Sequence, residues 1–129
     1  MNNKKILLVE DDLYTRELYL DLLQNEGFLV TPAVNGEIGL GEAIKGGYDL
    51  ILLDIMMPKK DGITFLKEYQ TSETQKPNGQ IIMLTNVGED AIIKTCMELG
   101  ATGFLIKSAL TPDEVLREVK NYLSASPPN

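Results

Sequence analysis

The chain has 129 residues, of which 43% are hydrophobic and 24% are charged, and its formal net charge at pH 7 is −7. These values suit one globular domain with a complete core, and they exclude disordered and fibrous classes and argue against direct nucleic-acid binding through the overall charge. No apolar run approaches the roughly 18 residues of a membrane span, and the single cysteine suits a reducing compartment, so we expect a cytoplasmic protein without membrane insertion.

Short apolar runs alternate with helical segments along the chain. The expected strands are residues 6–9, 28–30, 50–53, 81–84 and 104–106, and the expected helices are residues 13–26, 36–45, 63–70, 89–99 and 112–123. The runs are continuous and rich in Ile, Leu and Val, as in strands that are buried on both faces of a parallel sheet. Strict alternation of strand and helix therefore predicts an α/β fold, a single doubly wound domain with a five-stranded parallel sheet and five helices on both faces.

Local signals refine several of these elements. Gly39 and Gly41 lie inside the second helix, where each costs about 1 kcal/mol relative to alanine. Thr111 is the expected N-cap of the last helix and Pro112 its first residue. Residues 1–124 form the expected domain, and residues 125–129 are a tail or the stub of a linker. The first helix has four apolar residues at helical spacing that are expected to face the core: Tyr14, Leu18, Leu22 and Leu23.

Polar side chains follow four of the apolar runs directly. They are Glu10, Asp11 and Asp12 after the first run, Asp54 after the third, Thr85 after the fourth and Lys107 after the fifth. A few acids after one strand often form only a solvated turn, but the carboxyl ends of parallel strands meet at one edge of a sheet, where open α/β folds bind ligands. Crowded carboxylates repel unless a cation lies among them. The joint pattern therefore predicts a site for a divalent metal and a phosphoryl group.

The chain contains no histidine, so any metal must be held by oxygen ligands. Oxygen ligands favour Mg²⁺, Ca²⁺ or Mn²⁺ over Zn²⁺, and a site that also binds a phosphoryl group suits Mg²⁺, with Mn²⁺ as a possible substitute. Asp11 and Asp54 are the natural direct ligands, and the longer Glu10 can act through a water molecule.

These motifs together resemble the receiver domain of two-component response regulators. The matching segments are residues 6–12, 49–58, 61–62, 82–85 and 100–107, and the resemblance extends from Lys4 to about Leu123. It implies a flavodoxin-like sheet with strand order 2-1-3-4-5. It also implies a bacterial phosphorelay switch, which is not an enzyme in the usual sense because it catalyses only its own phosphorylation and dephosphorylation.

The resemblance implies roles for single residues in phosphoryl transfer. Asp54 would accept the phosphoryl group from the phosphohistidine of a sensor histidine kinase or a phosphotransfer protein. Mg²⁺ would be held by Asp11, Asp54 and the backbone carbonyl of Met56. Glu10 would support these ligands without binding the metal directly. The missing histidine fits this implication, because the donor histidine belongs to the partner.

The resemblance also implies a switch. Thr85 and Lys107 would bind phosphoryl oxygens, and Thr85 and Phe104 would move together to change the surface of the fourth helix, fifth strand and fifth helix. That surface would contact a downstream effector or output domain, in a monomer or a weak phosphorylation-dependent dimer. The residues that tune the lifetime of the phosphoryl group would be Met56, Asn86 and Val87, and because neither Met56 nor Val87 can orient a water molecule, we expect slow self-dephosphorylation.

Three residues depart from the family pattern. Ser108 stands where receivers have a proline joined through a cis bond, which leaves open whether the Lys107–Ser108 bond is cis. Asn86 is larger than the usual residue, and Phe104 lacks the usual tyrosine hydroxyl. These departures keep a second interpretation open, in which the domain is a receiver-like interaction module that never accepts phosphate.

Two further alternatives rank lower. A haloacid-dehalogenase-type phosphohydrolase needs an aspartate two residues after the nucleophile, where this chain has Met56. Flavin or nucleotide binding would require a glycine-rich loop after the first strand. The sequence leaves open whether the natural protein is a lone receiver or part of a longer regulator, and it does not identify the kinase.

Overall fold

The computed structural model describes residues 3–86 and 89–124, so Val87 and residues 125–129 lie outside the described residues. The strands are β1 (Lys5–Val9), β2 (Leu29–Ala33), β3 (Leu50–Leu53), β4 (Gln80–Thr85) and β5 (Gly103–Ile106). The helices are α1 (Leu13–Asn25), α2 (Gly36–Lys45), α3 (Gly62–Gln70), α4 (Asp90–Glu98) and α5 (Pro112–Ser124), and a 3₁₀ turn (Lys107–Ala109) precedes α5. In these ranges no helix has both the length and the apolar character that a membrane crossing requires.

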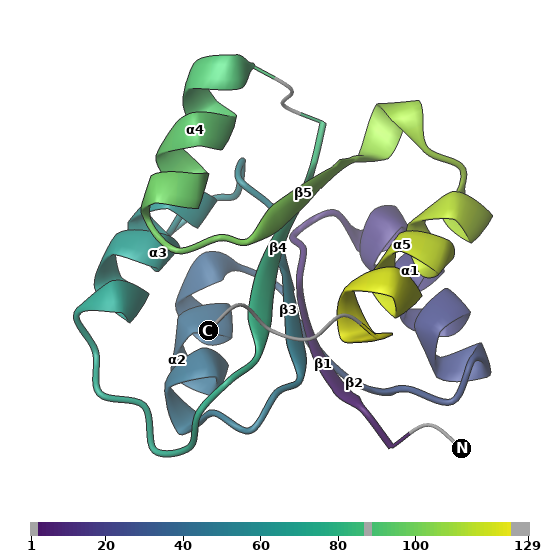
Figure 1. Ribbon diagram of the computed structural model, residues 1–129, viewed down its shortest axis with the longest axis horizontal. Coiled ribbons are helices and arrows are strands. Elements are labelled where there is room, and N and C mark those ends of the chain that lie inside the picture. The colour runs from purple at the N-terminus through teal and green to yellow at the C-terminus, as the bar shows by residue number, and fades with distance from the viewer. Residues whose placement is uncertain (1–2, 87–88, 125–129) are drawn as a thin grey trace.

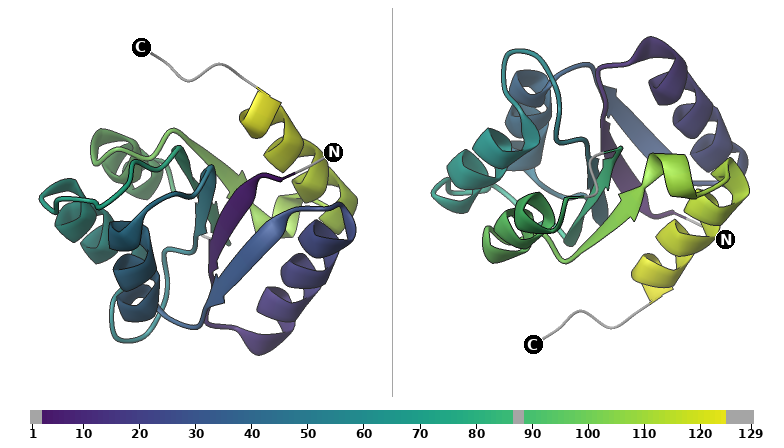
Figure 2. Two further views of the ribbon diagram at one scale, coloured as in Figure 1. Left: turned by 90° about the horizontal axis from the view of Figure 1, so that it is seen from below. Right: turned by 90° about the horizontal axis from the view of Figure 1, so that it is seen from above.

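The five strands form one parallel sheet in the order β2-β1-β3-β4-β5, which confirms the expected fold and strand order. Helices α2, α3 and α4 cover one face of the sheet and α1 and α5 cover the other (Figures 1 and 2). β1 and β3 are neighbours at the centre, and their register pairs Val9 with Leu53. The residues that follow these two strands, Glu10 and Asp54, therefore emerge side by side.

Side chains of the central strands divide between two hydrophobic cores, one on each face. In β1, Leu7 and Val9 pack on the side of α2 and α3, whereas Ile6 and Leu8 pack on the side of α1 and α5. This alternation is the two-residue period of a strand, and all of these residues are apolar because both faces are covered. Packing on both faces of the sheet fixes the central strands and therefore the positions of their carboxyl ends.

The second strand differs from its prediction. It spans Leu29–Ala33 instead of residues 28–30, and it includes Thr31 and Pro32. β2 is an edge strand that pairs only with β1, and edge strands tolerate proline and polar residues. Phe28 lies outside the strand, but its side chain is buried in the core beneath α1 and α5.

The structure confirms two of the four residues predicted to form the inner face of α1. Leu23 is buried and Leu22 packs against the core, but Tyr14 is 81% exposed and Leu18 is also exposed, while Tyr19 faces inward. Apolar residues occur on more than one side of this helix, so spacing alone allows two faces. Contact with the sheet selects the face that contains Tyr19 and Leu23.

The start of α5 agrees with its prediction. The Thr111 hydroxyl oxygen accepts a hydrogen bond from the Glu114 backbone N–H at 3.2 Å, and the Glu114 carboxylate accepts one from the Thr111 backbone N–H at 2.8 Å. This reciprocal capping box satisfies backbone donors that have no partner within the helix. It fixes where the chain turns from the 3₁₀ turn into α5.

Two glycines of α2 should respond in opposite directions to replacement by alanine. A Cβ at Gly41 would meet nothing within 4 Å, so Gly41→Ala should raise the free energy of unfolding by about 1 kcal/mol. A Cβ at Gly39 would lie 2.7 Å from both methyl groups of the buried, stiff side chain of Val9, so Gly39→Ala should lower it by about 1–3 kcal/mol. Urea unfolding of both variants checks the pair, and equal effects would contradict the close packing of α2 on β1.

Candidate functional site

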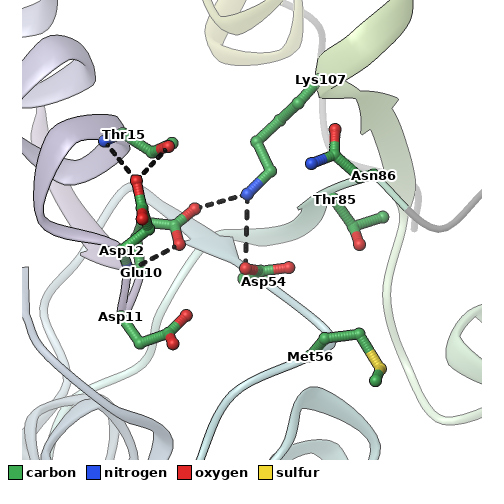
Figure 3. A pocket seen from close by; sticks show the side chains of 9 residues that line it. All are labelled: Glu10, Asp11, Asp12, Thr15, Asp54, Met56, Thr85, Asn86 and Lys107. Carbon is green, nitrogen blue, oxygen red and sulfur yellow. Dashed lines mark hydrogen bonds and ion pairs between the residues drawn. The ribbon is translucent and has the colours of Figure 1, made fainter.

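A cavity of about 390 Å³ opens at the carboxyl edge of the sheet (Figure 3). Its wall comes from the ends of β1, β3, β4 and β5 and from the first turn of α1. Among the expected site residues that the structure describes, Phe104 alone does not line it. The lining residues are Glu10, Asp11, Asp12, Thr15, Asp54, Met56, Thr85, Asn86 and Lys107.

The three acids after β1 have different environments. Glu10 is only 1% exposed, and one of its carboxylate oxygens accepts a hydrogen bond from the Asp12 backbone N–H at 3.1 Å. The Asp12 carboxylate caps α1, because it accepts hydrogen bonds from the backbone N–H and the hydroxyl of Thr15 at 2.9 and 2.7 Å, which lower its pKa. Asp11 lies between them, half-buried, with its carboxylate at the cavity.

Asp54 is fixed by the loop that follows β3. Its side chain is buried, and one carboxylate oxygen accepts a hydrogen bond from the Ile55 backbone N–H at 2.7 Å. Gly62 packs so closely that a Cβ there would lie 2.6 Å from the Asp54 carbonyl oxygen, and Asp61 caps α3 through the Thr64 N–H at 2.8 Å. These contacts restrain the loop between β3 and α3 and so fix the backbone that carries the Asp54 side chain.

Lys107 reaches across the cavity from the end of β5. Its ammonium donates to a Glu10 carboxylate oxygen at 2.7 Å and lies 3.3 Å from the Asp54 Oδ2 atom (Figure 3). The described backbone has no cis peptide bond, so the Lys107–Ser108 bond is trans and continues into the 3₁₀ turn. Serine in place of proline therefore does not prevent the lysine from approaching the two acids.

Burial and mutual contact shift the pKa of both partners of this ion pair. Burial raises the pKa of Glu10 to about 6, and the negative charge of Asp54 adds to this effect, although the hydrogen bond from Lys107 opposes it. Burial alone would lower the pKa of Lys107, but the hydrogen bond to Glu10 and the charges of Asp54 and Glu10 outweigh burial and raise it. Lys107 is therefore charged at neutral pH and partly neutralises the acids.

The acidic side chains fit a hard divalent cation. One carboxylate oxygen from each of Glu10, Asp11 and Asp54 can be chosen so that all three lie within 4.8 Å of one another. Such a set supplies oxygen ligands and negative charge on one side of the cavity, and the open side leaves room for water and phosphate oxygens, as Mg²⁺ prefers. The donors present thus match the expected Mg²⁺ or Mn²⁺.

The remaining expected residues differ in how deeply they are buried. Thr85 is buried at the end of β4, whereas Met56 and Asn86 are exposed at the cavity mouth. Phe104 is 40% exposed, because the side chain of Leu105 fills the core and successive residues of a strand face opposite sides. Phe104 is therefore not a core residue in this conformation.

Sequence reasoning missed two residues that shape the site. Thr15 lines the cavity and bonds to Asp12, and Arg16 donates hydrogen bonds to the backbone carbonyls of Glu10 and Asp11. A polar residue three positions after a candidate N-cap is a detectable signal for Thr15. A bond from an arginine to a backbone carbonyl has no comparable sequence signature.

The raised pKa of Glu10 gives a sign to the pH dependence of the metal-free protein. The folded protein binds a proton at Glu10 more tightly than the unfolded chain, so this group makes folding less favourable as the pH rises from 4.5 to about 6. The loss is at most about 2 kcal/mol, and less where water in the cavity screens the charges. Urea unfolding in EDTA should show this slope in the wild type and a flatter one in Glu10→Gln; parallel slopes would contradict the assignment.

Comparison with known proteins agrees with this geometry. Residues 6–120 match the family model described as the response regulator receiver domain. The chain is 42% identical over 127 residues to the transcriptional regulatory protein CpxR homolog of Haemophilus influenzae, covering 97% of this chain and 53% of that protein. It is 32% identical over 121 residues to the chemotaxis protein CheY of Bacillus subtilis, covering 93% of this chain and 98% of CheY.

Solved structures give the same result. A chain of the CheX-CheY-BeF3-Mg+2 complex from Borrelia burgdorferi matches with a TM-score of 0.81 and 28% identity, covering 95% of this chain and 90% of that chain. The chain spans about half the length of the transcriptional regulators that it matches. The family match over most of the chain, together with the sheet order and the acidic cavity, shows that this chain belongs to the response regulator receiver domains of two-component signalling systems.

Proposed function

We propose that Asp54 is the phosphoacceptor of this receiver and that Mg²⁺ is required for the transfer. The observation that carries the proposal is that the Asp54 carboxylate belongs to two arrangements at once. It completes the acidic cluster with Glu10 and Asp11, and it lies 3.3 Å from the ammonium of Lys107, which also contacts Glu10. A nucleophilic oxygen that adjoins both a candidate cation site and a fixed ammonium suits attack on a phosphoryl group.

Six of the residues that line the cavity have a role in this proposal. An Asp54 oxygen attacks phosphorus, the bond from phosphorus to the donor histidine nitrogen breaks, and the electron pair leaves with that nitrogen. Asp11, Asp54 and the Met56 backbone carbonyl would hold Mg²⁺, which would neutralise charge on the phosphoryl oxygens, and Glu10 would support these ligands. Lys107 releases its contact with the acids and pairs with a phosphoryl oxygen, and Thr85 donates its hydroxyl to another.

The partners belong to the same proposal. The donor is the phosphohistidine of a sensor histidine kinase or phosphotransfer protein, and the reader is an effector or output domain that contacts α4, β5 and α5. Movement of Thr85 toward the phosphoryl group, with Phe104 turning inward from its exposed position, would change that surface. The proposal includes a cytoplasmic location, because the buried thiol of Cys96 suits a reducing compartment.

The alternative, an interaction module that never accepts phosphate, depends on Ser108 and Asn86. Ser108 gives it no support, since Lys107 contacts Glu10 and Asp54 across a trans bond. Asn86 is exposed at the cavity mouth and can only restrict access from one side. The contact of Asp54 with Lys107 and its place in the acidic cluster therefore support a phosphoacceptor over the interaction module.

Mass spectrometry after incubation with acetyl phosphate tests the proposal. The wild type should gain about 80 Da, the mass of one phosphoryl group, with Mg²⁺ and not with EDTA. Asp54→Ala should gain nothing, whereas the control Asp21→Ala, which removes an exposed carboxylate of α1 outside the cavity, should still be labelled. A folded wild type that binds Mg²⁺ and is never labelled would favour the interaction module.

The phosphorylated protein should lose its label slowly, over many minutes. Met56 is exposed at the cavity mouth but has no group that can hold a water molecule in line with phosphorus. Met56→Asn supplies an amide at this position and should shorten the lifetime. Quenched mass spectrometry after removal of acetyl phosphate measures both proteins, and loss from the wild type within seconds would refute the expectation.

A further inference from the structure

Arg16 connects the first turn of α1 to the acidic loop after β1. One guanidinium nitrogen, Nη1, donates to the carbonyl oxygen of Glu10 at 2.9 Å and to that of Asp11 at 3.1 Å. These carbonyls belong to two of the three residues whose carboxylates form the acidic cluster. The arginine thus fixes the peptide groups that direct both side chains, although it does not line the cavity.

The rest of the loop is fixed by different contacts. The backbone N–H of Glu10 bonds to the Ala33 carbonyl at 3.1 Å, and Asp12 is held by the Thr15 cap. Neither contact reaches the carbonyl oxygens of Glu10 and Asp11, which Arg16 binds. Arg16 therefore supplies a separate restraint on the segment between the end of the sheet and the start of α1.

Two effects of Arg16 on metal binding have opposite signs. As a positive charge near the acids, it should repel Mg²⁺, and its removal should tighten binding. As a restraint, it keeps the carboxylates directed at one point, and its removal should weaken binding. Residues that orient metal ligands through hydrogen bonds commonly influence metal affinity. The sign of the change on substitution thus distinguishes the two roles.

We propose that Arg16 is a positioning residue that holds the Glu10 and Asp11 peptide groups, so that the Asp11 carboxylate reaches the metal and the Glu10 carboxylate supports the ligands. This inference rests on the proposed Mg²⁺ site but not on the identity of the phosphoacceptor. Arginine suits the role because its side chain is always charged and its guanidinium geometry is rigid. Since its side chain does not line the cavity, we expect it to act on metal affinity and not on the chemical step.

Mg²⁺ titration by calorimetry on the 129-residue chain tests the proposal. Arg16→Met should raise the Kd for Mg²⁺ about tenfold, whereas Arg117→Met, which removes the other arginine from the exposed side of α5, should change it by less than about twofold. At saturating Mg²⁺, the rate of labelling by acetyl phosphate should return to near the wild-type value in Arg16→Met. Circular dichroism establishes that both variants are folded at the temperature of the titration.

Unchanged or tighter Mg²⁺ binding by Arg16→Met would overturn the proposal. A rate that stays low at saturating Mg²⁺ would also overturn it, since Arg16 would then act on the reaction itself. If the wild type bound no Mg²⁺, the proposed function would fail separately. Amide hydrogen exchange in EDTA then tests the restraint by Arg16 alone. Faster exchange at the Asp11 and Asp12 amides in Arg16→Met than in Arg117→Met supports the restraint, and equal exchange in the two variants overturns it.

Discussion

Replacing Lys107 with methionine is expected to lower the free energy of unfolding of the metal-free protein at pH 7 by about 3–5 kcal/mol. The ammonium is the cation that contacts both Glu10 and Asp54, and all three side chains are largely buried. Methionine keeps most of the length of the side chain but leaves two neighbouring carboxylates without a counter-charge. The destabilisation should shrink on acidification, because the pKa of Glu10 is already raised and would rise further.

The surface pair of Lys45 and Glu42 provides the control. Its nitrogen and oxygen lie 3.0 Å apart, but the lysine side chain is 65% exposed, so Lys45→Met should cost at most about 1 kcal/mol. Mg²⁺ should stabilise Lys107→Met more than it stabilises the wild type, because the metal replaces the missing charge. Urea unfolding at two pH values, with EDTA or Mg²⁺, measures all of these differences; equal losses in both lysine variants would contradict the buried network.

The same variant separates stability from phosphoryl transfer. In Lys107→Met, Mg²⁺ binding should be retained or tightened, since the competing ammonium is gone, while labelling by acetyl phosphate should be much slower. That combination would assign Lys107 to the phosphoryl group and not to the metal. Loss of Mg²⁺ binding in a folded Lys107→Met protein would instead mean that the lysine is needed to build the acidic site.

The central part of this fold was predictable because its signals are redundant. β3 has the predicted bounds, since four consecutive apolar residues are required where both faces of a strand are covered. Once β1 and β3 are neighbours, the polar residues after them must meet at one edge. Glu10, Asp54 and Lys107 could therefore be brought together from sequence, although they are far apart in the chain.

The rest was not predictable for physical reasons that differ from place to place. β2 continues through Thr31 and Pro32 because an edge strand has little apolar pattern. The outward direction of Phe104 follows from which of its neighbours fills the core, and the sequence of a four-residue strand does not decide that. The bonds from Arg16 depend on how the first turn of α1 approaches the loop after β1, a geometry that only the folded chain provides.

The second large effect is expected at Phe65, on the face of α3 that packs against the sheet. Its side chain is fully buried and its ring stacks on that of Tyr69, with the ring centres 6.1 Å apart. Phe65→Ala should lower the free energy of unfolding by about 3–5 kcal/mol, because it removes apolar contact and leaves a cavity between tightly packed elements. Urea unfolding at pH 7 measures the loss.

Phe104→Ala is the matched control, because it deletes the same side chain from a site that is 40% exposed. In the unmodified protein it should change the free energy of unfolding by less than about 1 kcal/mol. If Phe104 turns inward on phosphorylation, the same substitution should cost more in the phosphorylated protein, and the difference between the two states measures how far the switch depends on this ring. An equal effect in both states would assign the switch to Thr85 and the backbone, with Phe104 remaining a surface residue.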